Sequence, residues 1–158
     1  MALIKERVEL ARRGENPAVM LKLRTGWAVF GDVQFLPGYS LLLPDPVVPS
    51  LNDLATDARA AFLGEMAMIG DAILEVTGAA RINYEILGNT EPELHAHIFP
   101  RYASEPMDRR TKPVWFYDWK NAPRFCEADH GKLKGRITEA IRRRANNSVH
   151  GRLASSPP

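Results

Sequence analysis

Residues 93–101, Glu93-Leu-His-Ala-His-Ile-Phe-Pro-Arg101, alternate between ionisable and apolar side chains over their first six positions. A period of two predicts a β-strand, here over residues 94–99, in which residues two apart share one face. Glu93, His95 and His97 then project to the same side, about 7 Å apart per step, while the apolar residues between them face the core. One face of this strand therefore carries a carboxylate and two imidazoles.

Three interpretations of this cluster compete. In the simplest, the two histidines are exposed strand residues without a function. In the second, Glu93, His95 and His97 are ligands of a zinc ion, because zinc accepts carboxylate and imidazole donors. In the third, a neutral imidazole attacks phosphorus and forms a phosphoramidate that water later cleaves, provided that its other nitrogen is held in the right tautomer. The alternation alone does not choose among them.

The segments on either side predict further strands and helices. Alternating or apolar runs between turn residues predict strands at residues 18–24, 27–30, 39–43 and 81–87, in addition to 94–99. Apolar residues three or four apart predict a short helix over 2–13, one long helix from Leu54 to Val76 and a helical stretch around Leu133, Ile137 and Ile141. This order favours an α+β domain with an antiparallel sheet of about five strands, one long helix and a C-terminal helical extension.

The length of 158 residues fits one domain. We expect this domain to span residues 1–145 and to be followed by a flexible tail over 146–158, which ends Ala-Ser-Ser-Pro-Pro. Cys126 is the single cysteine, which excludes an intrachain disulfide and favours a reducing compartment. The charged start of the chain and the lack of a long apolar run argue against a signal peptide and a membrane span, so we expect a cytoplasmic protein without a membrane partner.

Two other features have a plain explanation beside a functional one. Arg142-Arg143-Arg144 could contact nucleic acid, but no aromatic residue is interleaved with it, so a solvated helix end is preferred and no nucleic-acid partner is expected. Trp115, Phe116, Tyr117 and Trp119 follow the last predicted strand. Packing is the favoured explanation for these aromatic residues, and coverage of a nucleobase is the alternative.

The stretch from His95 to Arg101 resembles the signature of the histidine triad superfamily of nucleotide hydrolases and transferases, His-φ-His-φ-His-φ-φ followed by Pro-Arg. Gly88-Asn89-Thr90, which ends five residues before His95, is similar to the phosphate-binding turn of that family. Residues 36–39, Leu-Pro-Gly-Tyr, resemble its Pro-Gly-His segment, and Asp32 stands where the family has a ribose-binding Asp or Asn. The likeness covers roughly residues 17–102, which we take as the domain core, with 103–145 as a C-terminal extension.

The resemblance implies a role for each matching residue. His95 is expected to be the nucleophile and His97 to contact phosphate oxygens and assist the leaving group. Asn89 and Thr90 are expected to donate hydrogen bonds to the phosphates, Asp32 to bind ribose hydroxyls, and Asn83 to contact phosphate or sugar. No metal or other cofactor is required, and a divalent cation is expected only as part of a substrate complex.

The implied activity is hydrolysis at the α-phosphorus of a nucleotide, with dinucleoside polyphosphates as the leading substrates, in a homodimer. Two positions depart from the family, because Glu93 replaces the first triad histidine and Tyr39 replaces the histidine after Pro-Gly. We expect Glu93, alone or with Tyr39, to orient an imidazole and thus to belong to the catalytic group. The alternatives are a nucleotide-binding protein without catalysis and a metal-dependent enzyme that uses Glu93, His95 and His97.

Overall fold

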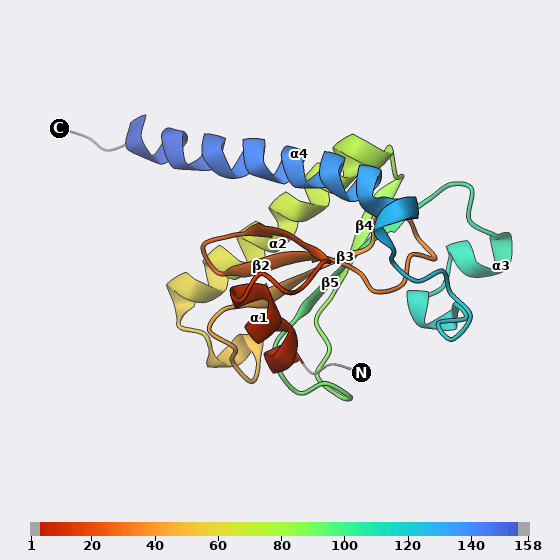
Figure 1. Ribbon diagram of the computed structural model, residues 1–158, viewed down its shortest axis with the longest axis horizontal. Coiled ribbons are helices and arrows are strands. Elements are labelled where there is room, and N and C mark those ends of the chain that lie inside the picture. Colours follow the sequence, from red (N-terminus) through yellow and green to blue (C-terminus); the bar gives the residue numbers. More distant parts are fainter. Residues whose placement is uncertain (1–3, 155–158) are drawn as a thin grey trace.

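Five antiparallel strands form one sheet in the order β1-β2-β3-β5-β4 (Figure 1). The computed structural model describes residues 4–154. The strands are β1 (Val19–Lys22), β2 (Gly26–Phe30), β3 (Ser40–Pro44), β4 (Arg81–Glu85) and β5 (Ala96–Arg101). The predicted α+β fold with about five antiparallel strands is confirmed.

The last strand begins later than its alternation predicted. Residues 94–99 were expected to be extended, but β5 starts at Ala96, so Glu93 and His95 lie in the connection before it. The reason is a change of partner, because the Leu94 amide donates to the carbonyl of Val48 in the loop after β3 (2.9 Å) instead of to a neighbouring strand. The side-chain alternation nevertheless persists through this connection, since Leu94 and Ala96 belong to the hydrophobic core.

The helices are α1 (Ile4–Arg12), α2 (Thr56–Thr77), α3 (Met107–Arg110) and α4 (Glu127–Ala154), with short 3-10 turns at Leu51–Asp53 and Val114–Phe116. The long predicted helix corresponds to α2. It ends at Gly78, whose φ of 66° lies in the left-handed region that glycine adopts without strain. The Gly78 amide donates to the carbonyl of Leu74 (2.9 Å) and so satisfies one of the last carbonyls of the helix.

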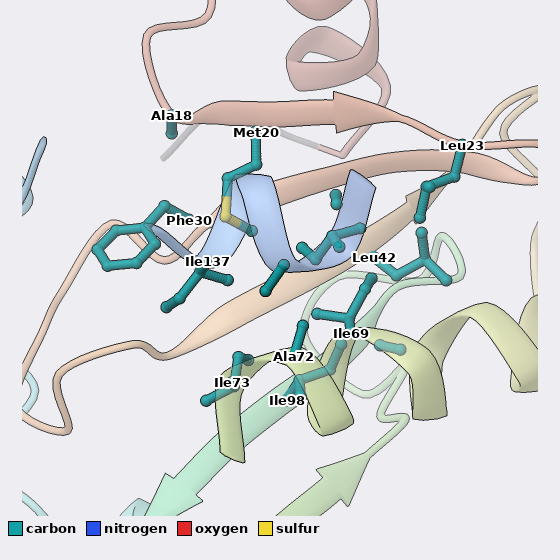
Figure 2. Close-up of a cluster of buried hydrophobic side chains, with 14 of the residues drawn as sticks. Ala18, Met20, Leu23, Phe30, Leu42, Ile69, Ala72, Ile73, Ile98 and Ile137 are labelled. Carbon is teal, nitrogen blue, oxygen red and sulfur yellow. The ribbon is translucent and has the colours of Figure 1, made fainter. Parts of the chain in front are cut away.

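Helices α2 and α4 cover one face of the sheet. Figure 2 shows their side chains meeting those of the strands, with Ile69 and Ile73 from α2 and Ile137 from α4 packed near Leu42 and Ile98. These five side chains are buried. Burial of such aliphatic side chains stabilises a fold by about 1.5 to 3 kcal/mol each. This layer therefore holds the strands in place and leaves the other face of the sheet for a site.

A smaller second core lies on that other face. Val8 of α1 packs there with Leu41, Leu43 and Phe99 of the sheet and with Val114 from the segment after β5. Alternation along β5 places Phe99, and His97 two residues before it, on this same face. This face of the sheet thus combines an apolar cluster with the ionisable side chain of His97.

Helix α4 continues to Ala154 and extends past the rest of the protein in Figure 1. It therefore runs beyond residue 146, where the sequence predicted the tail to begin. The end of that tail, residues 155–158, lies outside the described residues, and the flexibility of 146–158 and the boundary of the domain stay predictions. Among residues 4–154, no helix combines the length and the apolar character that a membrane crossing needs.

Candidate active site

A cavity of about 890 Å³ lies on the sheet face opposite α2 and α4. Its walls come from four parts of the chain: α1, the connection between β2 and β3 with the start of β3, the loop before β5 with β5 itself, and the segment after β5. The polar and aromatic residues that line it are Arg7, Asp32, Tyr39, Asn89, Thr90, Glu91, His95, His97, Trp115, Trp119 and Arg124. Both histidines of the sequence motif therefore face one cavity.

The His95 ring is fixed by a backbone carbonyl. Its Nδ1 lies 2.7 Å from the carbonyl oxygen of Glu93. A carbonyl oxygen can only accept, so Nδ1 of the neutral ring carries the proton and Nε2 keeps its lone pair. The ring is 6% exposed and lines the cavity. His95 thus has the tautomer that a nucleophilic imidazole needs.

The His97 ring is oriented by the hydroxyl of Tyr39, which can donate to Nδ1, whereas the carbonyl beside His95 can only accept. Nδ1 of His97 lies 2.8 Å from the hydroxyl of Tyr39. Burial, with smaller contributions from His95 and Arg7, lowers the pKa of His97 from 6.5 to about 3, so the ring is neutral near pH 7. Burial also raises the pKa of Tyr39 above its ordinary value, so the phenol keeps its proton. Tyr39 can then donate to Nδ1, which leaves the proton of His97 on Nε2.

The two imidazoles both present Nε2 and can differ in whether that atom carries a proton. Their ring centroids are 4.8 Å apart and their planes are inclined at 73°. His95 has an unprotonated Nε2, which can attack, and His97, with Tyr39 donating to its Nδ1, has a protonated Nε2, which can donate a hydrogen bond. A bound group between them would meet an electron pair from one ring and a proton from the other.

Three of the predicted binding residues line the same cavity. Asn89 and Thr90 lie on the exposed loop before β5, and Asp32 lies in the connection between β2 and β3. Asp32 forms an ion pair with Arg7 of α1. The Arg7 side chain is 16% exposed, against 47% for Asp32. Arg7 is thereby fixed at the cavity wall and brings a positive charge there.

Two other predicted residues do not line this cavity. Asn83 lies on β4, where its side-chain oxygen accepts from the Arg101 guanidinium (2.7 Å), and it lines a separate cavity beside that strand. The side chain of Glu93 does not line this cavity either, and its buried Oε2 has no hydrogen-bond partner among residues 4–154. Glu93 touches His95 through its backbone carbonyl, which any residue could supply.

The sequence motifs did not indicate Arg7 and Arg124. Arg7 precedes the segment that resembles a known family, and a single arginine on a short amphipathic helix carries no local signal. Trp115 and Trp119 were noticed as an aromatic cluster, and packing was the favoured explanation for it. The structure places both at the cavity wall, so spatial neighbours that are far apart in sequence complete the site.

The geometry also bears on the metal interpretation. Within residues 4–154, no three His, Cys, Asp or Glu side chains are placed so that they could hold one metal ion. Glu93, His95 and His97 therefore do not form a three-ligand site, because the Glu93 side chain does not line the cavity that both imidazoles face.

Solved structures share this architecture. A histidine triad protein from Sinorhizobium meliloti has a TM-score of 0.68 and 23% identity, over 82% of this chain and 93% of its own. One from Marinobacter aquaeolei has a TM-score of 0.70 and 20% identity, over 80% and 90%. A hypothetical histidine triad nucleotide-binding protein from Sulfolobus tokodaii has a TM-score of 0.67 and 15% identity, over 87% and 91%.

This chain has the histidine triad fold. Comparisons of the sequence with protein-family models and with curated proteins give no match. At these identities the structural likeness concerns the fold, and the chemistry has to be argued from the residues of the cavity. The histidine triad fold predicted from residues 17–102 is confirmed.

Proposed function

We propose that the protein is a nucleotide hydrolase that cleaves at the α-phosphorus through a covalent intermediate on His95. The observation that carries this proposal is the hydrogen bond between Nδ1 of His95 and the Glu93 carbonyl, at 2.7 Å in the wall of a cavity. That bond fixes the proton on Nδ1 and keeps a lone pair on Nε2, as nucleophilic catalysis requires. Dinucleoside polyphosphates are the leading substrate class.

The reaction has two steps. In the first, Nε2 of His95 forms a bond to the α-phosphorus, the bond from phosphorus to the bridging oxygen breaks, and the leaving phosphate takes the electron pair. His97, whose Nε2 carries a proton, donates a hydrogen bond to the oxygen on which this charge develops. In the second step, water attacks the same phosphorus, the P–N bond breaks and His95 recovers its lone pair. The nucleoside monophosphate leaves with the new P–O bond, and the proton that the water loses passes to solvent.

The other residues of the cavity would bind the substrate. Asn89 and Thr90 would donate hydrogen bonds to phosphate oxygens, and such bonds to a charged acceptor are stronger than those between neutral groups. Asp32 would accept from ribose hydroxyls, with Arg7 keeping its carboxylate in place. The nucleotide-binding protein from Sulfolobus tokodaii, which has the same fold, supports a nucleotide as the ligand class.

No metal ligand or other cofactor is needed for these two steps, and a divalent cation would enter only with the substrate. We also propose that the protein is a cytoplasmic homodimer, as the family resemblance implies. Sedimentation equilibrium of the purified protein tests the dimer and would contradict it by giving the mass of one chain.

Mass spectrometry of a quenched reaction tests the covalent intermediate. The wild-type protein should carry a nucleotidyl adduct on His95, and His95→Ala should bind nucleotide without forming the adduct or turning over. His130→Ala is the matched control, because His130 lies near the start of α4 outside the cavity. Nucleotide binding without an adduct in the wild-type protein would favour a non-catalytic nucleotide-binding protein instead.

A further inference from the structure

The segment after β5 forms one wall of the cavity and is attached to the strand that carries His97. Arg101, at the end of β5, donates to the carbonyl oxygens of Arg109 (3.2 Å), Arg110 (3.3 Å) and Lys112 (3.0 Å). Its guanidinium is also paired with Glu105, and both side chains are buried. The wall therefore has a fixed position relative to the histidines before any ligand binds.

Trp115 has a defined orientation in this wall. Its indole Nε1 donates to Oε2 of Glu85 on β4 (2.6 Å). Its ring is stacked on Trp119 with centroids 4.8 Å apart and an angle of 12° between the planes. The ring centroid of His97 lies 5.5 Å away, with the planes at 87°. The indole is thus fixed by a hydrogen bond from its nitrogen to Glu85 and by stacking of one face on Trp119, and it lies beside the His97 ring.

This orientation is not that of an ordinary core residue. Trp115 is 43% exposed and lines the cavity, whereas Val114 next to it is fully buried. A large aromatic surface that is both fixed and exposed leaves apolar area in water, which is unfavourable unless something covers it. Because its position is fixed by Glu85 and Trp119, a planar ligand could stack on it without a further loss of side-chain entropy.

We propose that Trp115 is a specificity-determining residue whose indole stacks on the nucleobase of the substrate. The proposal rests on the proposed function, since it assigns the aromatic part of the nucleotide whose phosphate would lie at His95 and His97. Every nucleobase has a flat π-face, so such a platform selects for a nucleotide over an inorganic phosphate without selecting strongly among bases.

The test compares two ligands and three variants by calorimetry. The ligands are adenosine monophosphate, which has a base, and inorganic tripolyphosphate, which has none. Trp115→Ala should bind the nucleotide about tenfold more weakly or worse, in the range found for base stacking, and should bind tripolyphosphate as the wild type does. Trp115→Phe keeps a flat ring and should recover most of the lost affinity.

Phe116→Ala is the matched control, because Phe116 is adjacent, is 54% exposed and does not line the cavity. It should leave both affinities unchanged. Unchanged nucleotide binding in Trp115→Ala, or an equal loss for both ligands, would overturn the proposal and leave the hydrolase proposal standing. If the wild-type protein binds no nucleotide at all, the proposed function fails together with this inference.

Discussion

The hydroxyl of Tyr39 lies 2.8 Å from Nδ1 of His97, and both side chains are buried. Tyr39 stands where the Pro-Gly-His segment that the sequence resembles has a histidine, and in this chain a phenol lies beside the second imidazole. A phenol with a raised pKa cannot act as a base near pH 7, but it can donate one hydrogen bond in a fixed direction. The tautomer of His97 therefore depends on Tyr39.

Tyr39→Phe should lower kcat by about tenfold with a small effect on KM. Without the hydroxyl, Nδ1 of His97 has no donor, and part of the population shifts its proton from Nε2 to Nδ1. An unpaired buried nitrogen also destabilises the fold by roughly 1 to 3 kcal/mol. Steady-state kinetics and 15N NMR of the imidazole measure the two effects. Tyr102→Phe is the control, since its hydroxyl bonds to the Pro37 carbonyl and the residue does not line this cavity.

His97 should stay neutral well below the pH at which an ordinary histidine titrates. Because burial lowers its pKa from 6.5 to about 3, the ring should show no NMR titration between pH 8 and about pH 5. The unfolded chain does take up this proton, so the stability contribution is complete above about pH 6.5 and is lost as the pH falls toward 3.

The stability measurement compares the wild type with His97→Gln at several pH values. The free energy of unfolding of the wild type should fall relative to the variant as the pH decreases from 6.5, by up to about 1.4 kcal/mol per pH unit. An identical pH dependence in both proteins would contradict the neutral, buried state of His97.

Glu93→Gln should retain turnover within about twofold and an unchanged pH–rate profile. The bond that orients His95 comes from the backbone carbonyl, and a glutamine preserves it. The variant also replaces a buried oxygen without a hydrogen-bond partner among residues 4–154 by an amide. A large fall in kcat, or a shifted acidic limb of the profile, would restore the original expectation that the carboxylate acts in catalysis.

Arg7→Gln should weaken tripolyphosphate binding by roughly tenfold, because it removes a fixed positive charge from a cavity in which His97 is neutral. Binding to the wild type should fall with salt, and the fall should be shallower in the variant. Arg13→Gln is the control, because Arg13 directly follows the same helix, is exposed, pairs with Glu15 and does not line the cavity. Equal affinities in all three proteins would exclude Arg7 from the anion site.

Arg101→Met should lower the free energy of unfolding by about 3 to 5 kcal/mol, because it leaves Glu105 buried without its partner. Chemical denaturation measures this loss. The same variant should release the wall that carries Trp115, so nucleotide affinity should fall as well. Arg143→Ala removes an exposed ion pair with Glu75 and should change stability by less than about 1 kcal/mol.

Much of the fold could be predicted because its patterns are local. Alternation at residues 81–87 and the spacing of apolar residues from Leu54 to Val76 each depend on a few neighbours. Both elements form, although β4 ends at Glu85 and α2 spans Thr56–Thr77. The start of β5 could not be predicted in this way, because it depends on the bond between Leu94 and Val48, which are distant in the chain.

The site residues that lie close together in the sequence could be predicted. Those that only the folded chain brings to the cavity could not. His95 and His97 are two residues apart, and Asn89 and Thr90 precede them by a few positions, so their shared cavity follows from one short segment. Arg7 and Trp115 reach the cavity from opposite ends of the chain. The side chain of Glu93 was expected beside the histidines because of alternation, but the alternation holds only from Leu94 onward, and the Glu93 side chain does not line the cavity.

The position of β5 between β3 and β4 has a consequence for synthesis of the chain. Residues 40–44 leave the ribosome long before residues 96–101, yet β3 pairs with β5 on that side. Until then β3 is an open edge of five buried residues, which is a template for association with other chains. The insertion of β5 closes this edge and places His97 beside Tyr39 in the same step. Protection of β3 from aggregation and assembly of this part of the cavity therefore depend on the same strand pairing.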